Sequence, residues 1–495
     1  MERTSSRSHG VSIPQSFPVV LLLFLTACFQ VGTIKAIGIY LKDISWSLGT
    51  SSTEIGVALG LFSAFGFFPA PLIVALYRVR SIRRWILILG SCLISLGVIL
   101  TALATNNTLI AVYLSISGVG HCMVGICSTV ALSHVASEQN FDILYGMGMS
   151  GFGLGMVLLP FLAEVFGDSY GWRGGLLLLG VLMANLVPCA MTIETDPANN
   201  HRTNNQPSGP SEDRLSSRCS DSSASEDWDE GAPLCQEGTI CSNHRPKRKT
   251  SDYYDCVDED DVDDENGSDC PSGSSMDPIP CQSHEQNSES RSFIERMNHR
   301  IRQSDFYRDP VMVVMLVDSL LFGLLSCGWH GFLVPLAVQR GYSIHATILM
   351  TLFAAFGNSL GRIIAGTLSG RLTKPIILFL GAALLNTLTI LCDVFLRFYY
   401  VMLVTAFLSA LTIAGMSVLG PLAMKKRASP ENFDVVYSVD EQFFGLGTFL
   451  GGYLSGVVAQ HFASYDASFK LLAGVEIAVF LLMFPALLIK KPVDL

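Results

Sequence analysis

The chain has 495 residues, of which half are hydrophobic and only 15% are charged. A soluble globular protein carries about 25% charged residues. This composition, with a mean hydropathy of +0.43, excludes a soluble domain and predicts an all-α protein that crosses the lipid bilayer many times. The net charge of −10 misleads, because residues 252–269 hold ten acidic side chains and neither Lys nor Arg. The remainder is balanced, so we expect neither a nucleic-acid partner nor a field that selects cations.

Twelve apolar stretches reach the length of about 20 residues that a membrane-spanning helix needs. They predict a short N-terminal tail (1–16), a six-helix bundle (17–194), a polar linker (195–308), a second six-helix bundle (309–489) and a C-terminal tail (490–495). The expected spans are 17–40, 54–77, 85–105, 108–133, 143–166, 173–193, 310–338, 344–369, 375–396, 399–424, 435–459 and 468–489.

Basic residues follow the even-numbered spans, and lysine and arginine concentrate in cytoplasmic loops. The positions are Arg78, Arg80, Arg83, Arg84, Arg371, Lys374, Lys425, Lys426, Arg427, Lys490 and Lys491. This pattern predicts that both termini and the linker are cytoplasmic.

The linker is rich in Ser, Asp, Glu, Asn and Pro and cannot bury enough apolar surface to fold alone, so it is expected to be disordered. Its end, 293–306, matches a basic amphipathic helix that would lie on the anionic inner leaflet, with a plain disordered linker as the alternative. Its six cysteines lack CxxC spacing, which favours free thiols over a zinc site.

A repeated motif indicates that the two bundles are homologous. Leu61–Gly66 reads LFSAFG and Leu352–Gly357 reads LFAAFG, and a basic residue follows each copy at the same offset, Arg80 and Arg371. Glycines cluster in the fifth and the eleventh span, which hold the same place in the two bundles. Small residues let membrane helices approach closely, and repeated bundles are typical of transporters.

Charged residues inside the spans are the main candidates for a functional site. Arg362 lies in the middle of the eighth span, and Asn358 lies one turn earlier on the same face. An uncompensated arginine at bilayer depth costs about 2.5 kcal/mol or more. Lys35 lies late in the first span. Each cation could instead have a purely structural role. Arg362 could donate hydrogen bonds to helix ends or carbonyl groups, and the Lys35 side chain could extend to the outer membrane interface. Together they would attract a carboxylate.

Two further groups lie in the seventh span. Asp318 is interpreted as a counter-ion of Arg362, a proton site or an interfacial acid, and His330 as a titrating group or a histidine bonded to a neighbour. Glu441 is expected to be interfacial and His121 to serve packing. The sequence has no nucleotide-binding motif, metal cluster or nucleophile constellation, so we expect no enzyme, no cofactor and no ATP-driven pump.

Four stretches resemble one known family. They are Gly32–Ile44, which contains Lys35, Phe166–Gly180 with its GWRG, Phe332–Gly366, and Ser464–Gly474. Each resembles the corresponding part of the monocarboxylate transporter family (solute carrier family 16), a branch of the major facilitator superfamily. The chain is identified as a divergent member of that family, because several other family signatures are absent.

The resemblance implies a major facilitator fold of twelve transmembrane helices in two six-helix halves. It also implies alternating access, a small organic anion or an amino-acid-like metabolite as substrate, the plasma membrane as location, and for some relatives a single-pass ancillary subunit. In proton-coupled relatives a lysine and an aspartate–arginine pair bind carboxylate and proton. The lysine corresponds to Lys35 and the arginine to Arg362, but the aspartate position holds Asn358.

Asparagine cannot take up a proton, so the sequence favours a facilitative or weakly proton-coupled transporter that binds substrate through Lys35, Asn358 and Arg362. The alternatives are a proton-linked monocarboxylate symporter that uses another acid, such as Asp318, and a transporter-like sensor or scaffold that acts through the linker.

Overall fold

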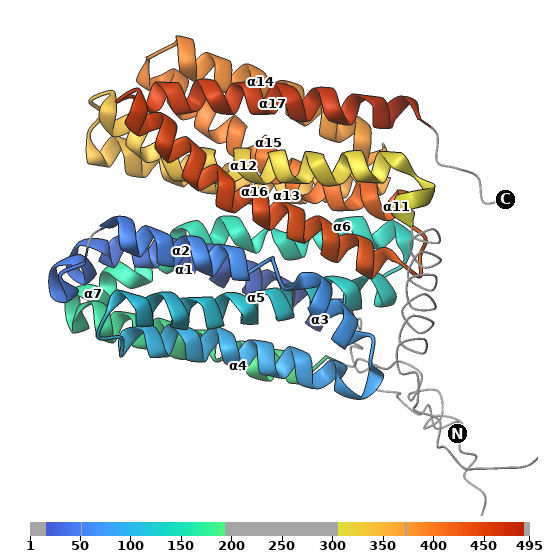
Figure 1. Cartoon of the computed structure of the whole chain (residues 1–495), viewed down its shortest axis with the longest axis horizontal. Coiled ribbons are helices and arrows are strands. Elements are labelled where there is room, and N and C mark those ends of the chain that lie inside the picture. Colours follow the sequence, from blue (N-terminus) through green and yellow to red (C-terminus); the bar gives the residue numbers. More distant parts are fainter. Residues whose placement is uncertain (1–15, 51, 194–304, 372–373, 490–495) are drawn as a thin grey trace, which may run out of the picture. The chain divides into compact units, whose positions relative to one another are not determined.

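The computed structural model describes residues 16–50, 52–193, 305–371 and 374–489, and the regular elements of these ranges are helices (Figure 1). The N-terminal tail, the linker up to residue 304, most of the amphipathic helix expected at 293–306, and the C-terminal tail lie outside the described residues.

The helices of the N-terminal half are α1 (Ser16–Leu48), α2 (Ser52–Phe65), α3 (Ala70–Tyr77), the short 3-10 helix η1 (Arg80–Ile82), α4 (Arg83–Ala102), α5 (Asn107–Val135), α6 (Glu138–Met149), α7 (Gly151–Met183) and α8 (Leu186–Met191). Those of the C-terminal half are α11 (Asp305–Arg308), α12 (Pro310–Gln339), α13 (Ile344–Arg371), α14 (Pro375–Phe395), α15 (Tyr399–Arg427), α16 (Phe433–His461) and α17 (Tyr465–Leu488).

The long helices are apolar around most of their circumference, as expected where one side faces lipid and the other a protein core. Eleven stretches of the described residues are long and apolar enough to cross a membrane. One of them, Asn140–Met191, has 52 residues and covers the predicted fifth span and the predicted sixth span except for its last two residues. Its helix is interrupted at Gly171, where φ is 67°. The twelve predicted spans are therefore all represented.

The second span is broken where the sequence predicts a continuous helix. α2 ends at Phe65, and α3 begins at Ala70 after a turn closed by a hydrogen bond from the Gly66 amide to the Phe62 carbonyl (3.0 Å). Pro69 lies at this break and has no N–H to continue the helical ladder. The corresponding repeat in the C-terminal half lacks proline and lies within the continuous helix α13.

Helix pairing is the same in the two halves. α1 packs against α7, α2 against α5, α4 against α5, and α4 against α7. In the C-terminal half, α12 packs against α16, α13 against α15, α14 against α15, and α14 against α17. Each C-terminal pair joins the helices that correspond in order to an N-terminal pair. The two halves therefore share one architecture, as the duplication predicted from the repeated motif requires.

Glycines make the closest contacts within each half. An added Cβ at Gly151 of α7 would lie 2.0 Å from the Phe24 carbonyl oxygen of α1. An added Cβ at Gly447 of α16 would also lie 2.0 Å from the Leu320 carbonyl oxygen of α12. These distances leave no room for any side chain. The glycine-rich fifth and eleventh spans are thus the sites of backbone-to-backbone packing.

The two halves meet through α13 on α6 and α7, and through α16 on α2 and α3. We call the end of the bundle that carries Arg78, Arg371 and Lys425–Arg427 the basic end; it lies at the right of Figure 1, near the start of α12. At this end an added Cβ at Gly146 of α6 would lie 2.5 Å from the Arg362 carbonyl oxygen of α13. This close backbone contact between α6 and α13 fixes the position of Arg362 along the long axis of the bundle.

Candidate functional site

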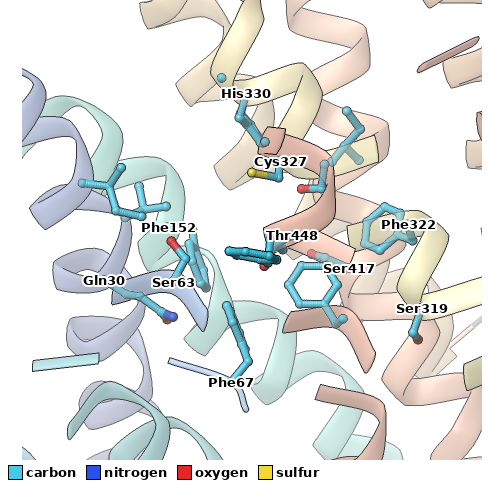
Figure 2. A pocket seen from close by; sticks show the side chains of 18 of the residues that line it. Gln30, Ser63, Phe67, Phe152, Ser319, Phe322, Cys327, His330, Ser417 and Thr448 are labelled. Atoms are coloured by element: carbon cyan, nitrogen blue, oxygen red, sulfur yellow. The ribbon is translucent and has the colours of Figure 1, made fainter. Parts of the chain in front are cut away.

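A cavity of about 870 Å³ lies between the two halves. Figure 2 shows Gln30, Ser63 and Phe152 on N-terminal helices, facing Cys327 and Thr448 from α12 and α16. The cavity also reaches the beginning of α2 and the end of α16, which lie at the end of the bundle opposite the basic end. All five residues predicted from the sequence line it, namely Lys35, Asp318, His330, Asn358 and Arg362.

Arg362 lies on the wall that α13 contributes. Its Nε donates a hydrogen bond to Asn358 Oδ1 (3.2 Å), and its guanidinium carbon lies 4.4 Å from the centre of the Phe152 ring. The side chain is only 7% exposed, and its Nη1 has no hydrogen-bond partner in the described part of the chain. An arginine that is buried in a cavity and keeps a free donor is suited to bind an anion.

Lys35 and His330 form a second polar group in the cavity. Lys35 belongs to a helix of 33 residues, so it lies nearer the middle of α1 than the shorter predicted span suggested. It lies within electrostatic range of His330 and Cys327 on α12, and His330 is also within range of Arg362. No ion pair of Lys35 with an acidic side chain is found among the described residues. The structure therefore places both predicted cations, unpaired, around one cavity.

Asp318 is not paired with Arg362. It is 2% exposed, and its Oδ1 has no hydrogen-bond partner among the described residues. Its electrostatic neighbours are Glu476 of α17 and Asp440 of α16, both of which are acidic. The interpretation as a counter-ion is thus not supported, and Asp318 is buried within the protein and not exposed at its surface. The interpretation as a proton site stays a prediction.

Glu441 corrects the sequence-based expectation of an interfacial acid, because it lines the central cavity. It lies within electrostatic range of Arg362 and of Asp440, which precedes it on α16. Asp440 accepts a hydrogen bond from Ser319 of α12. The eleventh span thus contributes two acids to the cavity wall, Asp440 and Glu441, that the sequence analysis had not assigned to a site.

Contacts between the halves close the cavity toward the basic end. The rings of Phe67 and Phe444 lie 5.2 Å apart in a T-shaped arrangement. Beyond them, the hydroxyl groups of Tyr145 and Tyr437 lie 3.4 Å apart. The cavity is lined toward this end by Met315, Met424 and Met483, which are at most 2% exposed, and it reaches the opposite end of the bundle. The structure therefore represents a state that is closed at the basic end.

Comparisons with known proteins agree with this architecture. A sequence model described as Major Facilitator Superfamily matches residues 23–392 and, overlapping, 319–494. The chain belongs to the major facilitator superfamily. Its similarity to solved structures supports the same fold: the FucP transporter in the outward conformation has a TM-score of 0.57 at 14% identity, with 95% of this chain and 99% of FucP covered. The human organic anion transporter MFSD10 has a TM-score of 0.58 at 14% identity, with 95% and 100% covered.

Characterised proteins whose sequences are similar to this major facilitator include several monocarboxylate transporters. Monocarboxylate transporter 11 of Mus musculus is 29% identical over 161 residues, 32% of this chain and 35% of the relative. Monocarboxylate transporter 12 of Xenopus laevis is 32% identical over 105 residues, 21% and 22% of the two chains. Monocarboxylate transporter 4 of Mus musculus is 24% identical over 207 residues, 41% and 43%. The matched segments thus span less than half of these relatives. The predicted fold and the resemblance to a divergent monocarboxylate transporter are confirmed.

Two polar contacts join the halves of this major facilitator at its basic end. Arg78, after α3, binds both carboxylate oxygens of Asp434 in the first turn of α16, at 2.7 Å each. Asp142 of α6 accepts a hydrogen bond from Ser369 (2.8 Å) and pairs with Lys426 Nζ (3.1 Å). Both contacts must break before the basic end can open. The hydrogen bonds to Asp434 raise the pKa of the Arg78 guanidinium above its ordinary value, so Arg78 stays charged.

The Arg78–Asp434 contact predicts the effect of Asp434→Asn. A half-exposed ion pair contributes about 0.2–1 kcal/mol, so we expect a shift of up to about fivefold toward conformations that are open at the basic end. Distances between spin labels at Ile39 and Phe462, which are exposed near the opposite end, report the shift. Arg80→Gln, which changes an exposed neighbour, serves as the control. If the label distances in Asp434→Asn equal those of the control, the pair does not hold this end closed.

Proposed function

We propose that this protein is an alternating-access transporter that moves a monocarboxylate or a related organic anion across the plasma membrane. The observation that carries the proposal is Arg362, a buried guanidinium that faces the cavity with one nitrogen free of partners. The relatives named monocarboxylate transporters support the class of substrate, and the unpaired Lys35 in the same cavity supports its negative charge.

The energetics of burial favour a binding role for Arg362. Its described side-chain hydrogen bond goes to the neutral amide of Asn358, and among the described residues no acidic side chain is close enough to form a direct ion pair with it. A buried charge without a partner is costly, and the carboxylate of a substrate would supply two charge-assisted hydrogen bonds at once. Lys35, on the other half, can bind the same anion and draw the halves together. This closure is the step that alternating access needs.

The rest of the lining favours a substrate with an apolar body. A volume of about 870 Å³ lies in the range of roughly 300–1,000 Å³ typical of sites for drug-sized ligands. Aromatic rings make up much of the wall, namely Phe62, Phe67, Phe152, Phe322, Phe332, Phe379, Phe444 and Phe449. We therefore expect aromatic or branched monocarboxylates to be better substrates than lactate.

Asn358 bears on the coupling of transport to protons. It occupies the position that the family resemblance assigns to a titrating aspartate, and its Oδ1 accepts the hydrogen bond from Arg362 Nε. An amide cannot exchange a proton at physiological pH. At this position helix α13 therefore has no group that could couple transport to protons. Transport is facilitative or weakly coupled unless an acid on another helix takes this role.

The test is uptake of labelled lactate, pyruvate, phenylpyruvate and phenylalanine by cells that express wild type, Arg362→Gln or Arg80→Gln at equal surface level. A charged pair that loses one partner in a buried site costs about 2–5 kcal/mol, so we expect uptake of the transported acid to fall about 100-fold in Arg362→Gln and to be unchanged in Arg80→Gln. Uptake that is the same in all three proteins would show that Arg362 does not bind the substrate.

A further inference from the structure

Four carboxylates form a chain from Arg362 into the core of the C-terminal half. Glu441 lies within electrostatic range of Arg362 and of Asp440. Asp440 lies in turn within range of Asp318, and Asp318 within range of Glu476. The chain thus links α13, α16, α12 and α17. In the described part of the chain, Arg362 is the one cation that acts on these four acids, and it lies at one end of the chain they form.

The inner three acids are unusually deeply buried. Asp318 is 2% exposed, Asp440 3% and Glu476 0%. Asp318 Oδ1 has no hydrogen-bond partner in the described ranges, and the group that interacts with the Glu476 carboxylate is the neutral amide of Asn386. An ionised carboxylate in an apolar interior is far more costly than a neutral one, and like charges at close range raise that cost. These acids therefore need protons or a bound cation.

A shared metal ion does not fit this arrangement. No group of three or more His, Cys, Asp or Glu side chains among the described residues is placed to hold one metal ion. The four acids are distributed over three helices and follow one another as a chain. A proton needs only one carboxylate at a time, so it is the cation that this geometry accommodates.

Glu441 lies where such a proton can be coupled to the substrate. It lines the central cavity and also a smaller cavity of about 40 Å³ on the side of the basic end. Gln30, Phe67 and Phe152, labelled in Figure 2, line both cavities as well and form the floor between them. The smaller cavity has room for water, which needs about 10–15 Å³ of such volume per molecule. Its wall includes His121, whose Nε2 has no hydrogen-bond partner among the described residues.

Arg362 and Glu441 are near one another without an ion pair among the described contacts, and Arg362 Nη1 is free. A carboxylate that enters the cavity can therefore bind the guanidinium. It then replaces Glu441 as the negative charge that stabilises the Arg362 cation. The titratable and charged groups that surround Glu441 from the neighbouring helices are Cys122 and His121 of α5, Tyr145 of α6, Arg362 of α13, Tyr437 and Asp440 of α16, and, beyond Asp440, Asp318 and Glu476.

We propose that Glu441 is the proton-coupling residue of this transporter: it takes up one proton when a substrate carboxylate binds Arg362, and it releases that proton when the substrate leaves. This inference rests on the proposed function and deepens it. Without substrate, the positive charge of Arg362 is balanced by the Glu441 carboxylate. With substrate, it is balanced by the substrate carboxylate, and Glu441 is neutral. One anion and one proton thus enter together, and the net charge of the site does not change.

The proton comes from water in the central cavity and leaves through the smaller cavity once the basic end opens. Asp440 precedes Glu441 on α16 and is the acid that acts on it, so a proton on Glu441 also removes the repulsion between these two carboxylates whenever Asp440 is ionised. Asn358 stands where proton-coupled relatives have an aspartate, so α13 lacks that acid. In this proposal Glu441 of α16 takes its role.

The proposal predicts the pH dependence of uptake. Because the loaded site contains a protonated Glu441, uptake increases as the pH on the substrate side falls, and coupling between two ligands typically changes affinity by about 5–150-fold. We expect uptake of phenylpyruvate to rise about tenfold from pH 8 to pH 6 in wild type. In Glu441→Gln, which has no titrating group there, we expect this rise to disappear. In Glu441→Asp it should return, and in the control Glu164→Gln, an exposed acid of α7, it should be unchanged.

A second measurement covers variants that bind but no longer transport. Calorimetric titration of purified protein with phenylpyruvate in two buffers of different ionisation enthalpy gives the number of protons taken up on binding. We expect about one proton for wild type and none for Glu441→Gln. The same proton uptake in both proteins, or the same pH profile, would overturn the role of Glu441. Uptake that depends neither on Arg362 nor on pH would instead remove the proposed function itself.

Discussion

Gly151→Ala and Gly447→Ala are each expected to remove most of the folded transporter from the cell surface. The added methyl group would lie 2.0 Å from a backbone oxygen, that of Phe24 in one half and that of Leu320 in the other. Backbone atoms cannot rotate away as a side chain can, so α1 must separate from α7, or α12 from α16, by more than an ångström. Overpacking of a tight core typically costs about 1–3 kcal/mol, and a backbone clash lies at or above that range.

The chain offers a matched control for these variants. Gly474, in the middle of α17, has nothing within 4 Å of an added Cβ, so Gly474→Ala changes helix propensity without changing packing. It should be neutral or slightly stabilising, since alanine is favoured over glycine by about 1 kcal/mol in a helix interior. The measurements are the surface fraction of tagged protein and its melting temperature in detergent. Equal stability of Gly447→Ala and Gly474→Ala would mean that the eleventh-span glycines do not determine helix packing.

The architecture could be predicted from the sequence because its determinants are local. An apolar stretch of sufficient length must form a helix in lipid, since every backbone group needs a partner within the segment. The repeated motif at Leu61–Gly66 and Leu352–Gly357 then identified two halves, which the helix pairing confirms. The interruption at Gly171 and the break before Ala70 were not predicted, because a turn inside an apolar stretch hardly changes its hydropathy.

The candidate site could be predicted only in part. Arg362 and Lys35 stand out in apolar stretches, and the structure places both in the cavity. Glu441 does not stand out, because it follows Asp434 and Asp440 in a segment whose beginning is polar, and hydropathy alone cannot show that the cavity extends to its level. Glu476 could have been found, since a single acid in the middle of an apolar span marks a candidate functional position by itself. That these acids face one another depends on helix packing between α12, α16 and α17, which the sequence does not show.

Removal of Arg427 is expected to destabilise the C-terminal half more than removal of any exposed arginine. Its guanidinium binds both carboxylate oxygens of Asp309 (2.6 and 3.1 Å), and the two side chains are 7% and 5% exposed. Asp309 also accepts a hydrogen bond from the Val311 amide as the N-cap of α12, and Arg427 donates to the Ile489 carbonyl after α17. The pair therefore ties the end of α15 to the start of α12 and the end of α17.

Arg427→Ala leaves the Asp309 carboxylate buried without its cation, and breaking such a pair from one side costs about 3–5 kcal/mol. The double variant Asp309→Asn, Arg427→Met removes both charges, while asparagine keeps the N-cap. We expect it to recover more than half of the loss, because paired removal of a buried ion pair is often nearly neutral. Arg397→Ala, which breaks the exposed pair with Asp466, should cost less than about 1 kcal/mol. Melting temperatures in detergent measure all three. If the double variant is less stable than Arg427→Ala, the ion pair itself, and not the unpaired charge, stabilises this end of the bundle.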